Sequence, residues 1–233
     1  MEVKTKTLTS FLNKFRMEGD QKIPEAVLRF EKDGLKINAN SPSKLARVVA
    51  WLKTTAFESY EELGNVGLND LENVVKVLNR FGEKIKISKE GNLITISGDS
   101  KKVDIQVVSE DFLESDTGEP NLEFKDNFEI TATKLKDIFQ DVRMNENALL
   151  TIETEDKKAV FTNTGKYKFK NVVDAPTCKG GVKVQFGKPF IDSLINFDGT
   201  LKISVASNYP ARVMEKLETS IVTMIVAPLV EEE

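Results

Sequence analysis

The chain of 233 residues contains no histidine, one cysteine and no apolar run near the roughly 18–20 residues of a membrane span. Without histidine it has no His metal ligand, no Ser-His-Asp triad and no Cys-His dyad. It also lacks a Walker-type phosphate loop and a GxGxxG motif. We therefore expect no enzymatic activity, no cofactor and no metal site. An enzyme would have to work through carboxylates or through a metal bound by oxygen ligands.

The single cysteine, Cys178, excludes an intrachain disulfide and fits a reducing compartment. The first residues, Met1 to Lys4, lack the charged and then apolar pattern of a signal peptide. Both features favour an intracellular protein.

Acidic residues outnumber basic ones, with 37 Asp and Glu against 33 Lys and Arg, which gives a net charge of −4. Nucleic-acid binders are usually basic overall, so this balance argues against broad, tight binding of phosphates. It still permits a local basic surface on an acidic body.

Two stretches of the chain, 2–108 and 128–230, repeat one pattern of strand, helix, four short strands, helix and further strands. We expect residues 2–7 and 128–132 to be the opening strands, each followed by a helix. The sequence therefore predicts two similar domains, 1–108 and 128–233, joined by a connector at 109–127. Corresponding apolar positions of the two opening helices are Leu8, Phe11 and Leu12 in the first half and Leu135, Ile138 and Phe139 in the second.

Many segments alternate apolar and polar residues with period two, as in 84–88, 93–97, 102–107, 167–170, 182–186 and 201–205. Such strands have one apolar face, which is typical of antiparallel sheets covered on one side. The fold class is therefore α+β.

The connector is acidic but also contains apolar residues, so we expect it to pack on a surface rather than to act as a flexible linker. These apolar residues include Phe112, Leu113, Leu122 and Phe124. For Phe112 and Leu113 we expect burial in the core.

Four helices are predicted, and each has an apolar stripe and a polar face with lysine or arginine. The second and fourth are expected at 68–81 and 188–197, with Asn69 as N-cap of the second and Thr133 as cap of the third. On one helix such basic residues most simply increase solubility. The basic residues outside the apolar stripes are Lys14, Arg16, Lys76, Arg80, Lys134, Lys136, Arg143 and Lys188.

Three stretches carry a resemblance to a known family. They are the apolar-Ala-Pro-apolar-acidic ending at 225–232, Asn208-Tyr209-Pro210 ahead of the last two strands, and Asp33-Gly34-Leu35 followed by Ser41-Pro42-Ser43. With the duplication and the connector, they resemble the DNA sliding clamps of the archaeal and eukaryotic type, PCNA, over essentially the whole chain. The sequence departs from the family at Arg47, where a hydrophobic pocket residue is common, and the chain is somewhat shorter than typical members.

The resemblance implies a closed ring of three subunits around duplex DNA, with helices lining the hole and antiparallel sheets outside. The eight basic residues named above would then face the DNA and bind phosphates without reading sequence. Ring closure would pair residues 102–108 with residues 166–173 of a neighbour; the alternative is a lysine-rich edge that blocks association. The residues implied at this joint are Val103, Ile105, Val107, Tyr167, Lys168 and Phe169.

The resemblance also implies a small apolar pocket beneath the connector, where client proteins insert aromatic anchors. Arg47 leaves the lining of this pocket open. The matching positions are Leu122, Phe124, Tyr209, Pro210, Ile225, Ala227 and Pro228.

The function implied is that of a DNA polymerase processivity factor and docking platform for replication and repair enzymes. The partners would be double-stranded DNA, DNA polymerase and other clamp-binding proteins, and an ATP-dependent clamp loader; the chain would form a homotrimer without contact to a membrane. The alternatives are a subunit of a heterotrimeric or checkpoint-like clamp, and a two-domain β-rich scaffold or virion protein that does not bind DNA. The expected location is the cytoplasm of an archaeon or a virus-infected cell, or a eukaryotic nucleus.

Overall fold

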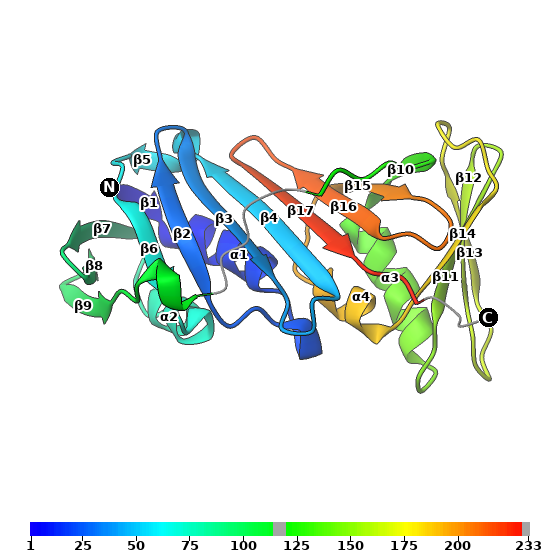
Figure 1. Ribbon diagram of the computed structural model, residues 1–233, viewed down its shortest axis with the longest axis horizontal. Coiled ribbons are helices and arrows are strands. Elements are labelled where there is room, and N and C mark those ends of the chain that lie inside the picture. The colour runs from blue at the N-terminus through cyan, green and yellow to red at the C-terminus, as the bar shows by residue number, and fades with distance from the viewer. Residues whose placement is uncertain (114–119, 230–233) are drawn as a thin grey trace.

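The computed structural model describes residues 1–113 and 120–229 of the chain. The connector residues Glu114, Asp116, Gly118 and Glu119, and residues 230–232 of the C-terminal signature, lie outside the described residues. The described residues form an elongated molecule (Figure 1).

The first half of the chain begins with a short strand and a helix, as expected, although the helix starts at Thr5 rather than after residue 7. Its elements are β1 (Glu2–Lys4), α1 (Thr5–Arg16), the 3-10 turn η1 (Gly19–Gln21), β2 (Ala26–Glu31), β3 (Gly34–Asn40), β4 (Ala46–Lys53), the 3-10 turn η2 (Thr54–Ala56), β5 (Phe57–Ser59), β6 (Gly64–Leu68), α2 (Leu71–Leu78), β7 (Lys84–Glu90), β8 (Leu93–Gly98) and β9 (Lys101–Gln106).

The second half repeats this order of strands and helices, except that it has no counterpart of the short β5. After the 3-10 turn η3 (Glu110–Phe112) in the connector, its elements are β10 (Asp126–Thr131), α3 (Ala132–Arg143), β11 (Leu150–Glu155), β12 (Lys158–Asn163), β13 (Lys170–Asp174), β14 (Val182–Phe186), α4 (Lys188–Ser193), β15 (Thr200–Val205), β16 (Ala211–Lys216) and β17 (Ser220–Val226).

The described strands form three sheets, and every strand pair in them is antiparallel. The largest sheet has the order β10-β15-β16-β17-β4-β3-β2-β6, so strands of both halves belong to it. A five-stranded sheet, β5-β1-β7-β8-β9, lies at one end of the molecule, and a four-stranded sheet, β13-β12-β11-β14, lies at the other (Figure 1). The α+β prediction with antiparallel sheets is confirmed.

Helices α1 and α3 lie behind the eight-stranded sheet in Figure 1 and bury their apolar stripes against it. The six predicted stripe positions of these helices are all buried. In α2, Leu71, Val74, Val75 and Leu78 are buried as their i, i+3, i+4, i+7 spacing predicts. The core thus lies between the helices and one face of the sheet.

The helix ends differ from the predictions for local reasons. The helix α2 begins after Asp70, whose Oδ1 accepts a hydrogen bond from the backbone N of Asn73 at 3.0 Å, so Asp70 and not Asn69 is the N-cap. In α3 the cap is Thr131 rather than Thr133, because Thr131 Oγ1 accepts from the backbone N of Lys134 at 3.2 Å. The helix α4 ends at Ser193, four residues before the predicted end at Phe197.

Asp126, at the start of β10, fixes the end of the connector to the second half. Its buried carboxylate accepts hydrogen bonds from the backbone N of Lys179 at 2.9 Å, from Gly180 N at 3.1 Å and from Thr154 Oγ1. Burial alone would raise the pKa of Asp126, but the hydrogen bonds from Lys179, Thr154 and Gly180 outweigh it and hold the pKa below its usual value.

A carboxyl group with a depressed pKa stabilises the fold above its unfolded pKa, and this contribution is lost as the pH falls through the folded value. For Asp126 the contribution is therefore present above about pH 4 and decreases below it, because the ordinary pKa is 3.8. We expect Asp126→Asn to be less stable at pH 7 and to show a flatter decline of stability below pH 4, measured by urea unfolding across pH. An unchanged pH profile in the variant would contradict this role.

Candidate functional site

Predicted basic residues on the helices do not all reach the surface. Lys76, Arg80, Lys134, Arg143 and Lys188 are exposed, whereas Arg16 and Lys136 are partly buried. The remaining residue, Lys14, is buried.

The prediction that Lys14 lies on an outer face is wrong, because Glu215 from β16 of the second half reaches this side of α1. The Lys14 Nζ lies 2.6 Å from Glu215 Oε2 and 3.6 Å from Asp198 Oδ2. The other carboxylate oxygen of Glu215 accepts from the backbone N of Asp198 at 3.0 Å and of Gly199 at 2.9 Å. Lys14 therefore joins the two halves instead of presenting a free charge.

Most of the other predicted cations have carboxylate partners on the same surface. Glu72 interacts with Lys22 and Lys76, and these two hydrogen bonds lower its pKa to about 2. Among the residues that the structure describes, no carboxylate lies within 4 Å of Arg80 or Lys134. The other pairs are Arg16–Glu18 at 2.8 Å, Lys136–Asp198 at 3.6 Å, Arg143–Asp192 at 2.8 Å and Lys188–Asp192 at 3.8 Å.

Lys6 is a further exposed basic residue on a helix that the sequence did not predict. The sequence predicts a strand at residues 2–7, whereas α1 includes Lys6 and exposes it. Lys6 and Lys4 border a hollow of about 320 Å³ between α1 and Leu217. The signal was the polar Thr5-Lys6-Thr7 run, which does not alternate with apolar residues as a strand would.

The predicted client pocket is only partly assembled from the residues expected. Phe124 and Tyr209 are in edge-to-face contact with ring centres 6.1 Å apart, and the Arg212 guanidinium lies 4.8 Å from the Phe124 ring centre. Leu122, Pro210, Ala227 and Pro228 are partly buried.

Ile225 does not offer an open apolar surface, because it is buried in the sheet. Its strand neighbours are Arg212 of β16 and Arg47 of β4, so all three share one face. Two exposed apolar residues, Leu45 and Leu229, are not among the positions predicted for the pocket. Leu45 accepts a hydrogen bond from Ala227 N through its backbone O at 2.8 Å, which links the loop before β4 to the C-terminal segment.

The residues predicted at a subunit joint lie on or beside two edge strands. In the described part of the chain, β9 pairs only with β8 and β13 only with β12. Val103 and Ile105 lie in β9, with Val107 just beyond it. The predicted strand at 167–170 is wrong for Tyr167, Lys168 and Phe169, which precede β13.

A side chain causes this difference at β13. Asn163 Oδ1 accepts from Phe169 N at 2.7 Å, and Asn163 Nδ2 donates to the backbone O of Thr164 at 3.0 Å and of Tyr167 at 2.8 Å. The chain therefore folds around the Asn163 amide where a ladder with β12 would otherwise continue.

At the connector turn η3, two adjacent apolar residues differ in their exposure to solvent. Leu113 is buried as predicted, but Phe112 is 81% exposed, so the expectation of core packing is wrong for Phe112. Leu113 lies against Gly67 of β6, whereas the preceding residue, Phe112, faces solvent.

Two kinds of feature are absent from the described residues. In residues 1–113 and 120–229, no group of three His, Cys, Asp or Glu side chains is arranged to hold a metal ion. No helix within those ranges has the length and apolar character needed to cross a membrane.

Three solved structures that share this fold over nearly their full length are PCNA structures. The structure of A. fulgidus PCNA bound to the C-terminal region of FEN-1 matches with a TM-score of 0.85 and 17% identity, over 100% of this chain and 98% of that chain. PCNA from Entamoeba histolytica matches with a TM-score of 0.82 and 15% identity, over 98% of both chains. A chain of the PCNA2–PCNA3 complex from Sulfolobus tokodaii matches with a TM-score of 0.78 and 19% identity, over 99% of this chain and 100% of that chain.

Sequence comparison alone finds no such relationship, because no protein-family model and no curated protein matches the chain. The likeness therefore concerns the fold, and it extends over the full length of both molecules.

The Lys14–Glu215 pair yields a prediction about stability. Removing one member of a buried ion pair leaves an uncompensated charge and typically costs about 3–5 kcal/mol. Because Glu215 keeps two backbone donors, we expect Lys14→Met to lower the free energy of unfolding by about 3 kcal/mol, measured by urea unfolding. The control is Lys6→Met on the exposed side of the same helix, with an expected change within about 0.5 kcal/mol. Equal effects of the two substitutions would contradict the assignment.

Proposed function

Because this chain has the fold of the PCNA sliding clamps along its entire length, we propose that it is a DNA sliding clamp that encircles duplex DNA and acts as a polymerase processivity factor. The observation that carries the proposal is the placement of the exposed basic residues and of the edge strands in the molecule. Exposed lysines and arginines lie on α2, α3 and α4. The edge strands β9 and β13, each paired on one side among the described residues, lie at opposite ends of the molecule (Figure 1).

The charge pattern supports loose contact with DNA rather than tight binding. Phosphates approaching Arg143, Lys188 or Lys76 compete with the carboxylates Asp192 and Glu72. Arg80 and Lys134 have no such competitor among the described residues, so they would make the strongest phosphate contacts. Contacts of this kind read no bases, and a ring is retained on DNA by its closure rather than by affinity.

The outer surface would serve as the docking platform. Phe124, Tyr209, Leu45 and Leu229 offer aromatic and apolar groups near the connector end and the C-terminal segment. In A. fulgidus PCNA, the molecule bound is the C-terminal region of FEN-1. By analogy, DNA polymerase and repair enzymes would bind here, and an ATP-dependent loader would open the ring. The site of action would be the compartment that holds the DNA, in the nucleus or in the cytoplasm of an archaeon or infected cell.

Two other functions fit some of these structural features. A heterotrimeric or checkpoint-like clamp would share the fold, and the S. tokodaii structure is a complex of two different PCNA chains. A two-domain scaffold without a DNA role would need no basic helix surface. Assembly state separates the first alternative from the proposal, and DNA retention separates the second.

The proposal is tested by topological retention, which needs no loader. The clamp is mixed with linear duplex DNA that is biotinylated at both ends, and streptavidin is then added to block the ends. We expect retention after a wash at about 1 M salt, where electrostatic contacts are screened within roughly 3 Å. Adding streptavidin first should abolish retention. Equal retention in both orders, or none in either, would contradict an encircling ring.

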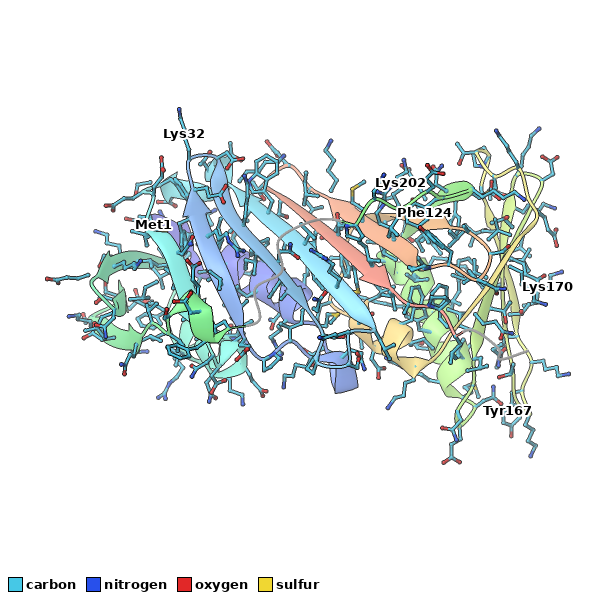
Figure 2. All side chains as sticks on the ribbon, in the orientation of Figure 1. Met1, Lys32, Phe124, Tyr167, Lys170 and Lys202 are labelled. Atoms are coloured by element: carbon cyan, nitrogen blue, oxygen red, sulfur yellow. The ribbon has the colours of Figure 1, made fainter. Side chains whose placement is uncertain are left out.

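The DNA-facing surface is tested by charge reversal. We expect Arg80→Glu with Lys134→Glu to weaken DNA binding at low salt and to reduce the slope of log affinity against log salt by about one for each lost phosphate contact. The matched control is Lys32→Glu with Lys202→Glu, two exposed lysines away from the helices, one in the turn between β2 and β3 and one on β15, labelled in Figure 2. An equal loss in the control would show that the effect comes from total charge and not from the helix surface.

A further inference from the structure

The outer face of the eight-stranded sheet is basic, although the chain as a whole has a net charge of −4. This face is turned to the viewer in Figure 1, because the helices pack on the opposite face. The charged residues that the strands place on the outer face are the acidic Glu31 and Glu129 and the basic Arg29, Lys36, Arg47, Lys53, Lys202, Arg212 and Lys216. An excess of one sign on one surface of an acidic protein attracts a partner of the opposite charge.

Several of these cations are not neutralised by a carboxylate, in contrast to most cations on the helices. Among the residues that the structure describes, no carboxylate group lies within 4 Å of Arg29, Lys53 or Lys216. Lys36 differs, because two carboxylates of the β2–β3 hairpin lie 2.9 and 3.0 Å from its Nζ. The uncompensated positive charge of the sheet therefore lies on either side of Lys36.

One row of the strand register has cations at both ends and apolar residues in its middle. Lys216 of β16 lies opposite Ile221 of β17, and Ile221 lies opposite Trp51 of β4. Trp51 lies opposite Lys36 of β3, and Lys36 lies opposite Arg29 of β2. Neighbouring strands are about 4.8 Å apart, so the row is roughly 19 Å long. Ile221 and Trp51 in its middle are both partly exposed.

The sheet face is hollowed beside Trp51. A hollow of about 470 Å³ is lined in part by Arg29, Lys36, Val49 and Trp51. Trp51 Nε1 donates a hydrogen bond to the backbone O of Asp33 at 3.0 Å, which fixes the orientation of the ring. Tryptophan and arginine are enriched among the residues that contribute most to protein–protein binding. The row thus combines an oriented aromatic anchor with uncompensated charge.

A protein segment fits this surface better than a nucleic acid does. Single strands bind through bases that stack on open aromatic rings. The Nζ atoms of Lys36 and Lys53 lie 5.8 and 5.9 Å from the centre of the Trp51 ring, so lysines already occupy the position that a base would need. Duplex DNA would contact the cations alone and leave Ile221 and Trp51 uncovered. A segment with carboxylates at its ends and apolar side chains in its middle would match the whole row.

We propose that this row is a docking site for an acidic protein segment of about six extended residues. Carboxylates of the segment contact Lys216 and Arg29, and its central apolar side chains cover Ile221 and Trp51. The site is distinct from the surface at Phe124, because Arg212, which contacts Phe124, lies about 13 Å along β16 from Lys216. It is also on the face opposite the helices, so the inference does not depend on the proposed encircling of DNA.

Trp51 is the only tryptophan of the chain, so its fluorescence reports directly on this site. The full chain is titrated at low salt with the capped hexapeptide Glu-Glu-Leu-Phe-Glu-Glu, which contains no tryptophan, and binding is measured in parallel by calorimetry. Two control peptides are Lys-Lys-Leu-Phe-Lys-Lys, which reverses the charge, and Glu-Glu-Gly-Gly-Glu-Glu, which removes the apolar centre. We expect the acidic apolar peptide to change the Trp51 emission and both controls to bind about tenfold more weakly or less.

Charge reversal at the two ends of the row tests the assigned contacts. We expect Arg29→Glu with Lys216→Glu to weaken binding of the acidic apolar peptide about tenfold or more, because attraction becomes repulsion. The matched control is Arg80→Glu with Lys134→Glu, which makes the same change of charge on the helix side and should bind the peptide as the unmodified chain does. Far-ultraviolet circular dichroism checks that both variants are folded.

Several results would overturn the inference. Heat of binding without a change in the Trp51 emission would place the peptide elsewhere on the molecule. An equal loss in the control variant would show that only net charge matters, and no binding at millimolar peptide would show that the row is not a docking site. Displacement of the peptide by oligothymidylate at a lower concentration would assign the face to single-stranded nucleic acid. The retention experiment tests the ring separately, and its failure would leave these results unchanged.

Discussion

Antiparallel pairing of β17 with β4 is the interaction on which the rest of the architecture depends. The register runs from Ser220 opposite Leu52 to Val226 opposite Ala46 and turns strands from two halves into one eight-stranded sheet. Its inner face buries Val48, Ala50 and Leu52 beside Val222, Met224 and Val226 against the helices. Because the sheet is continuous, the halves cannot rotate without breaking backbone hydrogen bonds, and the distance and angle between the two end sheets are fixed.

The Lys14–Glu215 pair reinforces this junction in a different way. A buried ion pair contributes little net stability, since desolvation offsets most of the attraction, but separating its members is costly. Glu215 receives Lys14 Nζ and two backbone donors. Any docking of the halves that moved α1 away from β16 would leave a buried carboxylate without its cation. The pair therefore disfavours other arrangements of the two halves more than it stabilises this one.

The sequence predicted what depends on local periodicity and missed what depends on distant neighbours. The stripe of α2 and the alternation of β9 could be read directly, and both appear in the structure. The burial of Lys14 could not be predicted, because its partner Glu215 is 201 residues away in the sequence. The start of β13 could not be predicted either, because the Asn163 side chain takes the hydrogen bond of Phe169 N where pairing with β12 would otherwise continue. At η3, a single turn decides that Leu113 is buried and Phe112 is exposed. Neither the strand nor the helix periodicity of apolar residues can predict which of the two is buried.

Strong strand pairing inside the subunit and neutralised charge on its helix surface together determine how a ring of this chain would operate. Carboxylates such as Asp192 neutralise much of the helix surface, so DNA contacts alone would not hold the protein at a primer. Retention must then come from closure, and the strength of the joint becomes the property that sets residence time. The β17–β4 junction is apolar on its inner face and continuous, whereas the ends at β9 and β13 are short and charged. Force applied to such a ring would separate the joints before it distorted the subunits, which is what opening and reclosing on DNA requires.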